Sequence, residues 1–154
     1  MRSVLFVCTA NLCRSPTAAG ILRGMLAKTG KAKEFEIASA GTHDYQVGQP
    51  PFPVAVELAR KRGYEITGST ARRISANDFD HFDYILAMDK ANLSNLRSIA
   101  PTRSKQKIEL LLNYGDAYYG KEVPDPFGGK EEGFALALDM IEDGCRGLTT
   151  LLLR

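Results

Sequence analysis

The apolar run at residues 3–8, SVLFVC, restricts the possible folds of this chain more than any other segment. A short, continuous apolar run is typical of a strand that is buried on both faces, as in a parallel sheet. From Pro16 to about Thr29, apolar side chains recur at the spacing of one helical face, and Gly30 then ends the helix. A buried strand followed directly by a helix predicts the first half of a β-α-β unit.

The same alternation of strand and helix continues along the chain. We expect further strands at residues 34–41, 82–88 and 107–112. We expect helices at residues 54–62, at a short segment opened by the capping-box sequence SAND (75–78), from a cap at Asp89 to about residue 100, and from residue 130 to the C-terminus. Residues 113–129 read as a long polar loop. This order predicts an α/β fold in which residues 1–154 form a single domain, a four-stranded parallel sheet with helices on both faces.

The composition and net charge of the chain give no indication of a nucleic-acid or membrane partner. The chain of 154 residues is 44% hydrophobic and 25% charged, with a net charge of +2, which is too small to indicate nucleic-acid or membrane binding. No apolar stretch approaches the roughly 18 residues of a membrane span, and no signal-peptide pattern opens the chain. The basic cluster is interpreted as solvated surface; it comprises Arg60, Lys61, Arg62, Arg72 and Arg73.

The three cysteines are too few and too irregularly spaced for a disulfide framework, so we expect a reducing, cytoplasmic location. Cys145, on the last expected helix, is interpreted as a core residue. The two histidines, His43 and His81, have no familiar zinc-binding spacing to the cysteines, so we expect neither a metal site nor a cofactor.

The segment Cys8–Ser15 lies where a parallel sheet places its ligands, beyond the carboxyl end of the first strand. Ser39–Gly41 and Asp89 follow other strands and meet the same edge. A loop that enters a helix here offers backbone N–H groups and the positive end of the helix dipole to an anion. The sequence is neither a Walker loop nor a dinucleotide-binding turn. We therefore predict a phosphate-binding loop between the first strand and the first helix; its residues are Thr9, Ala10, Asn11, Leu12, Cys13, Arg14 and Ser15.

A cysteine opens this loop and an arginine closes it. An electropositive loop favours the thiolate form of Cys8, which is the nucleophilic form. The planar guanidinium of Arg14 can bind two oxygens of one phosphate. Asn11, inside the loop, is among the few residues that accept a positive φ. Cys8 would then be placed for in-line attack on a bound phosphate.

With these residues, the chain resembles the low-molecular-weight protein tyrosine phosphatases. The family pattern at the N-terminus, Cys-x-Gly-Asn-x-Cys-Arg-Ser-Pro, corresponds to Cys8–Pro16, and the later Asp-Pro-aromatic pattern corresponds to Asp125–Phe127. Residues 39–42 (SAGT) and 82–93 (FDYILAMDKANL) also resemble family segments. The resemblance implies a cysteinyl-phosphate intermediate and hydrolysis of phosphotyrosine and small aryl phosphates without a metal.

The resemblance also implies a role for each residue that matches the motifs. Cys8 would be the nucleophile, and Arg14 would bind the phosphate and the transition state. Ser15 would hydrogen-bond the sulfur, and Asn11 would hold the shape of the loop. From the residues alone, Asp89 and Asp125 compete for the role of general acid; the resemblance favours Asp125.

This chain departs from the family pattern at two positions. Ala10 stands where the family has glycine, and Phe127 stands where many relatives have a tyrosine. Tyr45 and Phe127 are the candidate walls of the substrate pocket. Cys13 stands where the family can form a reversible disulfide with the nucleophile, and a buried thiol is the alternative.

Three other functions are considered. A thiol-linked arsenate reductase needs resolving cysteines near the third strand, and residues 87–96 contain none. An arginine-phosphate phosphatase of the same fold carries threonine where Leu12 stands. A non-catalytic phosphotyrosine-binding module needs neither Cys8 nor Asp125. We therefore expect a phosphatase acting on a phosphotyrosine-containing protein, with a tyrosine kinase among the candidate partners, as a monomer or weak dimer.

Overall fold

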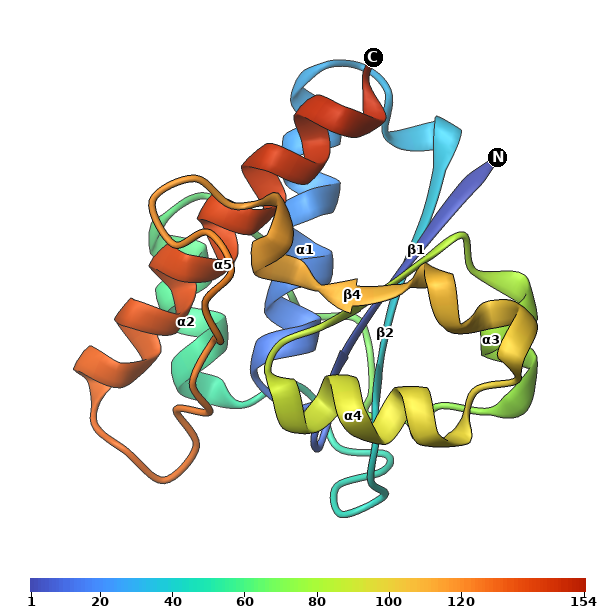
Figure 1. Cartoon of the computed structure of the whole chain (residues 1–154). Helices are drawn as coiled ribbons and strands as arrows, with labels where there is room; N and C mark the ends of the chain where they lie inside the picture. The colour runs from blue at the N-terminus through green and yellow to red at the C-terminus, as the bar shows by residue number, and fades with distance from the viewer.

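A computed structural model describes all residues, 1–154, and contains one four-stranded sheet. Its strands are β1 (Arg2–Cys8), β2 (Phe35–Gly41), β3 (Tyr84–Ala87) and β4 (Ile108–Leu110). They lie in the order β2-β1-β3-β4, and every neighbouring pair is parallel (Figure 1). The parallel α/β fold expected from the sequence is confirmed.

Helices cover both faces of the sheet (Figure 1). They are α1 (Arg14–Lys28), α2 (Pro53–Lys61), α3 (Ala76–His81), α4 (Lys90–Ile99) and α5 (Glu131–Leu152). Successive side chains of β1 point to opposite faces, so Val4 and Phe6 join one apolar cluster with α1, α2 and α5. Leu5 and Val7 join a second cluster with α3 and α4. Both faces of β1 are therefore fully buried, which explains its continuous apolar sequence.

The structure corrects several expected boundaries; the strand expected at 82–88, for example, covers Tyr84–Ala87. The strand expected at 107–112 covers only Ile108–Leu110, and Leu111–Tyr114 forms a 3-10 helix instead. The turn of this helix lets the adjacent side chains of Leu111 and Leu112 both enter the core, which the alternation of a strand would not allow. The first helix begins at Arg14 rather than at Pro16. Two further 3-10 helices, Ala32–Glu34 and Thr102–Lys107, were not expected.

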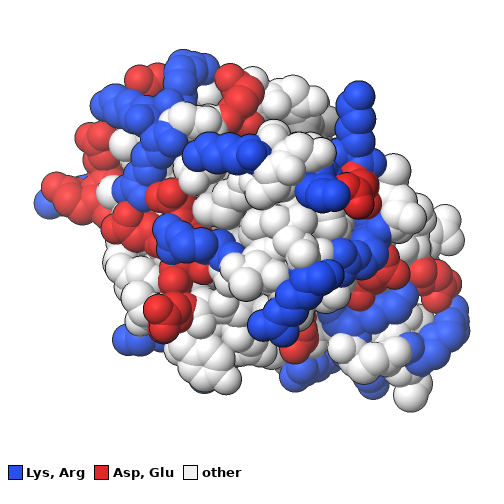
Figure 2. Space-filling model, turned by 90° about the horizontal axis from the view of Figure 1, so that it is seen from above, with Lys and Arg blue, Asp and Glu red and all other residues white.

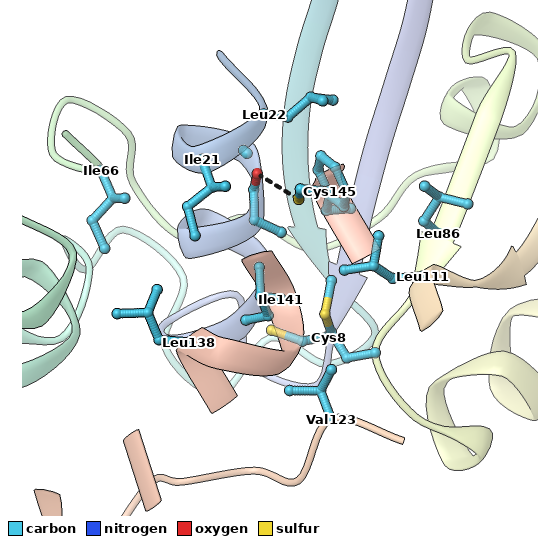
Figure 3. Packing of buried hydrophobic residues seen from close by; sticks show 14 of the residues in the cluster. Cys8, Ile21, Leu22, Ile66, Leu86, Leu111, Val123, Leu138, Ile141 and Cys145 are labelled. Atoms are coloured by element: carbon cyan, nitrogen blue, oxygen red, sulfur yellow. Dashed lines mark hydrogen bonds between the residues drawn. The ribbon is translucent and has the colours of Figure 1, made fainter. Parts of the chain in front are cut away.

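One of the two apolar clusters extends to the carboxyl end of β1 (Figure 3). Cys8 lies there beside apolar side chains of α5 and of the segment that carries Val123. Cys145 is fully buried, and its thiol donates to the carbonyl of Ala18 at 3.7 Å. Its expected place in the core is confirmed, and burial raises the pKa of its thiol.

Charged side chains of both signs lie interspersed on the face where the strands begin, opposite the end of β1 that carries Cys8 (Figure 2). That face presents no single-sign field that would attract one kind of polyion. None of the helices is both long enough and apolar enough to cross a lipid bilayer.

Candidate active site

The segment between β1 and α1 offers a set of free hydrogen-bond donors. No backbone N–H group of residues 10–13 donates to another protein group. The N-terminus of α1 has no side-chain cap and no acidic residue in its first turn. Buried backbone N–H groups are almost always paired, so this set of donors is suited to an anion. The phosphate-binding loop lies where the sequence places it.

Asn11 fixes the shape of the loop. Its φ of 57° is the only positive φ of a non-glycine residue in the chain. Its Nδ2 donates to Ser15 Oγ at 2.7 Å and to Ser39 Oγ at 2.9 Å. Its Oδ1 accepts the backbone N–H of Arg72 at 3.0 Å. The amide therefore ties the loop to β2 and to the segment between α2 and α3.

Arg72 belongs to the basic cluster expected to be solvated surface; its side chain is 39% exposed, and it also forms an ion pair. Its guanidinium donates to the two oxygens of Asp78, at 2.9 and 3.1 Å. Burial and the ion pair oppose each other at Asp78, and the hydrogen bonds from Arg72 and Ser75 hold the pKa of that carboxyl below its usual range. The Arg72–Asp78 ion pair therefore helps to position the backbone N–H of Arg72, which donates to Asn11 Oδ1.

Ser15 connects the loop to the sulfur of Cys8. Ser15 Oγ lies 3.0 Å from Cys8 Sγ and 3.3 Å from the carbonyl oxygen of Ala40. Because the hydroxyl accepts from Asn11, its own proton is left for the sulfur or for that carbonyl. The Ser15 hydroxyl is therefore placed to donate to the sulfur of Cys8.

Gly41, at the end of β2, lets the loop approach the sheet. A Cβ at this position would lie 2.7 Å from the carbonyl oxygen of Thr9 and 3.1 Å from the backbone nitrogen of Asn11. The N–H groups that follow hold the approach, since Thr42 donates to the carbonyl of Cys8 and His43 to that of Thr9. Ala10 has no positive φ, so alanine in place of the family's glycine imposes no backbone strain.

Arg14 is almost fully buried, and one of its two terminal nitrogens makes two hydrogen bonds within the protein. Nη1 donates to Asp89 Oδ2 at 2.7 Å and to the carbonyl of Val123 at 2.9 Å. Nη2 lies 3.7 Å from Asp125 Oδ2 and 3.5 Å from Thr9 Oγ1. The guanidinium is therefore held from one side, and its other edge faces the pocket.

The two candidate acids occupy different environments. Asp89 caps α4 by accepting the N–H of Asn92 at 2.7 Å, as expected, and it also binds Arg14. Asp125 is about half exposed, and its Oδ1 accepts the N–H of Phe127 at 3.1 Å. Asp89 is thus committed to two partners, whereas Asp125 lies at the mouth of the site. The cap of α4 is thus confirmed, and the ion pair of Asp89 with Arg14 was not expected from the sequence.

Asn92 is a site residue that sequence reasoning missed. Its side chain is buried, and Nδ2 donates to Thr9 Oγ1 at 3.1 Å. The only available signal was its position in the first turn of a helix that starts at the sheet's carboxyl edge. Asn92 and Arg14 both donate to Thr9, so the Thr9 side chain links the loop to α4.

A pocket of about 210 Å³ joins these groups. Its lining comprises Cys8, Thr9, Ala10, Leu12, Cys13, Arg14, Tyr45, Gln46, Asp125 and Phe127. Tyr45 stacks on His43 with ring centroids 4.9 Å apart. Phe127 meets Phe52 edge to face at 5.2 Å. Both expected walls, Tyr45 and Phe127, line the pocket; Gln46 was missed because no motif includes it.

Cys8 and Cys13 differ in their surroundings although both line the pocket. Burial, followed by the charges of Cys8 and Asp125, raises the pKa of Cys13 to about 12. Cys13 is therefore a thiol at neutral pH. All three cysteines are free, so a disulfide between Cys8 and Cys13 stays a prediction. The structure brings together no group of three or more His, Cys, Asp or Glu side chains that could hold a metal ion.

Comparison with known families decides the classification. The family model described as "Low molecular weight phosphotyrosine protein phosphatase" matches residues 3–154. The chain belongs to this family.

Individual members of the low molecular weight phosphatase family resemble the chain over most of its length. The low molecular weight protein-tyrosine-phosphatase YfkJ of Bacillus subtilis is 40% identical over 150 residues, which cover 96% of this chain and 94% of that protein. A crystal structure of a protein tyrosine phosphatase from Entamoeba histolytica, with Hepes in its active site, is 35% identical with a TM-score of 0.95, covering 99% of this chain and 97% of that one.

A third family resemblance includes a bound ligand. The Vibrio vulnificus protein Wzb, in complex with benzylphosphonate, is 25% identical with a TM-score of 0.85, covering 97% of this chain and 98% of that one. The fold and the position of the phosphate loop expected from the motifs are therefore those of this family.

Proposed function

We propose that residues 1–154 form one catalytic domain that hydrolyses phosphotyrosine and small aryl phosphates through a cysteinyl-phosphate intermediate. The observation that carries the proposal is the set of unpaired backbone N–H groups at residues 10–13. These residues belong to the loop that joins Cys8 to Arg14, and both of those side chains line the same pocket. A non-catalytic binding module needs an anion site but has no use for a thiol inside it. Cys8 and Asp125 line one pocket, which supports a reaction rather than binding alone.

In the first step, the Cys8 thiolate attacks phosphorus in line with the phenolic oxygen. The sulfur–phosphorus bond forms as the phosphorus–oxygen bond breaks, and Asp125 gives its proton to the departing phenolate. Arg14 and the loop N–H groups bind the equatorial oxygens, whose charge they stabilise in the transition state. Asp89 and Val123 hold Arg14 in the orientation that this contact needs.

In the second step, water attacks the phosphorus of the cysteinyl phosphate. Asp125, now ionised, takes a proton from this water, and the sulfur–phosphorus bond breaks. Ser15 Oγ, 3.0 Å from the sulfur, stabilises the thiolate that leaves. Inorganic phosphate is released, and the enzyme returns to its starting protonation state.

The pocket walls support an aromatic ester as the substrate. Tyr45 and Phe127 can contact the two sides of a phenyl ring, and the side chain of Leu12 lines the floor. The binding of benzylphosphonate by the similar Vibrio vulnificus protein agrees with an aryl substrate. The physiological substrate we propose is a phosphotyrosine-containing protein, with a tyrosine kinase as one candidate. The three free thiols agree with a reducing, cytoplasmic location, and we expect a monomer or weak dimer.

The test is turnover of a panel of phosphate esters in the presence of a chelator. Phosphotyrosine and para-nitrophenyl phosphate should be hydrolysed at full rate with EDTA, and phosphoserine and phosphoarginine slowly or not at all. Trapping with labelled aryl phosphate and acid quenching should place phosphate on Cys8. A preference for phosphoarginine, or activity that EDTA abolishes, would contradict the proposal.

A further inference from the structure

A second hollow of about 430 Å³ lies beside the active-site pocket, between α2, the turn at Gly128–Gly129 and the start of α5. Its lining comprises Phe52, Val54, Glu57, Leu58, Gly128, Gly129, Glu131 and Phe134. None of these residues belongs to the lining of the catalytic pocket. The two hollows therefore have separate linings.

One aromatic pair separates this hollow from the catalytic pocket. Phe127 lines the catalytic pocket, and its ring meets Phe52 with centroids 5.2 Å apart. Phe52 stacks in turn on Phe134, at 5.8 Å, and both of these rings line the second hollow. A substrate polypeptide whose phosphotyrosine lies over Cys8 therefore passes along this hollow if the polypeptide leaves the catalytic pocket on the side of Phe127.

The chemistry of the hollow suits a long cationic side chain. Its floor is apolar, from Val54, Leu58 and the two phenylalanines, whereas its rim carries the carboxylates of Glu57 and Glu131. Glu57 pairs with Arg60 at 3.3 Å, with both side chains exposed, and Glu131 makes no ion pair. Lysine and arginine lay their methylene stems on apolar surface while the charged end reaches a polar rim.

We propose that this hollow binds a lysine or arginine side chain of the substrate protein, two or three residues from the phosphotyrosine. The inference rests on the proposed phosphatase function and adds a sequence preference to it. The separation between the phosphotyrosine and the cationic residue is estimated from the width of the aromatic pair between the two hollows. An extended substrate polypeptide advances about 3.3–3.6 Å per residue, so two or three residues cross the distance of about one aromatic ring. Glu131 supplies the charge that the cation reaches.

Glu131 also has an ordinary structural role that the test must separate from binding. An acidic residue in the first turn of α5 stabilises the helix dipole wherever its side chain points. Glu132 occupies the same turn with the same charge but does not line the hollow. Glu132→Gln is therefore the matched control for Glu131→Gln.

The experiment compares kcat/KM for phosphotyrosine peptides in which one lysine, or its uncharged isostere norleucine, is moved through the flanking positions. For the unaltered protein, lysine should raise kcat/KM about two- to fivefold over norleucine at a position two or three residues from phosphotyrosine. Glu131→Gln should remove that increment, and Glu131→Lys should invert it. Arg60→Gln should enlarge it, because it frees Glu57.

The controls separate failure of this inference from failure of the phosphatase assignment. Hydrolysis of para-nitrophenyl phosphate, which cannot reach the hollow, should stay within twofold of the unaltered protein in every variant. No turnover of that ester by the unaltered protein would overturn the proposed function and, with it, this inference. Normal turnover with no preference for lysine at any position would overturn the inference alone. An equal loss of the increment in Glu132→Gln would also overturn it, since general charge would then explain the preference.

Discussion

The phosphate loop and the segment that carries Asp125 face the same pocket but are held very differently. The loop is buried, and hydrogen bonds through Asn11, Ser15 and Arg14 tie it to several other segments. The Asp125 carboxylate is half exposed, and its shortest contacts are the N–H of Phe127 and a 3.7 Å approach to Arg14. Two residues before Asp125 anchor this segment: Val123 donates to the carbonyl of Met88 and accepts from Arg14, and the carboxylate of Glu122 accepts the N–H of Lys90.

This difference matches the two tasks of the proposed reaction. The phosphoryl group is the same in every substrate, so a rigid, preorganised cradle suits it. The leaving group differs among substrates, so the acid that serves it is better placed on an accessible segment. If this difference holds, substitutions in the loop should impair every substrate alike, whereas substitutions of Asp125 should matter most for poor leaving groups.

Cys8→Ser should have the largest effect. A serine hydroxyl is not ionised at neutral pH, so kcat should fall by at least about 10⁴-fold. Binding of a phosphate ester should survive, because the loop N–H groups and Arg14 remain. Steady-state kinetics and calorimetric titration measure the two effects. Turnover within tenfold of the unaltered protein would remove Cys8 from its proposed role.

Arg14→Lys should reduce kcat/KM by about 10²–10³-fold, nearly as much as Arg14→Ala. A lysine cannot satisfy Asp89 and Val123 with one nitrogen and bind phosphate with another. The comparison of the two variants on one aryl phosphate measures the effect. A lysine variant that keeps half of the activity would contradict the need for a planar, two-sided group.

Two glycine-to-alanine changes should have opposite effects on stability. Gly41→Ala places a Cβ 2.7 Å from the carbonyl oxygen of Thr9 and should lower the free energy of unfolding by about 1–3 kcal/mol. Gly133→Ala, in α5, places its Cβ 4.0 Å from Pro126 and should raise that free energy by about 0.5–1 kcal/mol. Urea denaturation measures both. A neutral or stabilising Gly41→Ala would mean that the loop adjusts readily.

Thr9→Val should have the smallest effect. It removes the oxygen that accepts from Asn92 at 3.1 Å. The same oxygen lies 3.5 Å from Arg14 Nη2, which is too long to add much, so kcat/KM should fall by about two- to tenfold, the usual worth of one hydrogen bond. Thr9→Ser keeps the hydroxyl and should restore most of the activity. If serine is no better than valine, packing of the methyl group rather than the hydrogen bond explains the loss.

Local features of the site could be predicted from the sequence. The apolar run of β1 predicted a doubly buried strand, Asn11 predicted a residue with positive φ, and Asp89 predicted a helix cap; each is confirmed. These features depend on neighbouring residues, whose preferences act over a few bonds.

The contacts that complete the site join distant segments and could not be predicted in this way. Arg14 meets Asp89 across 75 residues and Val123 across 109, and Thr9 meets Asn92 across 83. Spacing in the chain carries no signal for such pairs. The contact of the Arg72 backbone N–H with Asn11, across 61 residues, is a further pair of this kind.

The most direct test of the division of labour is the leaving-group dependence of Asp125→Asn and Arg14→Lys. The kcat/KM values are measured on aryl phosphates that range from nitrophenyl to alkylphenyl esters. For Asp125→Asn, the loss should grow to about 10²–10⁴-fold as the phenol approaches the pKa of tyrosine, about 10. For Arg14→Lys, the loss should be the same across the series, because in the proposed mechanism Arg14 contacts the phosphoryl group of the substrate and not the leaving group. An equal loss across the series for Asp125→Asn would contradict the account and would move the acid role to Asp89 or another group.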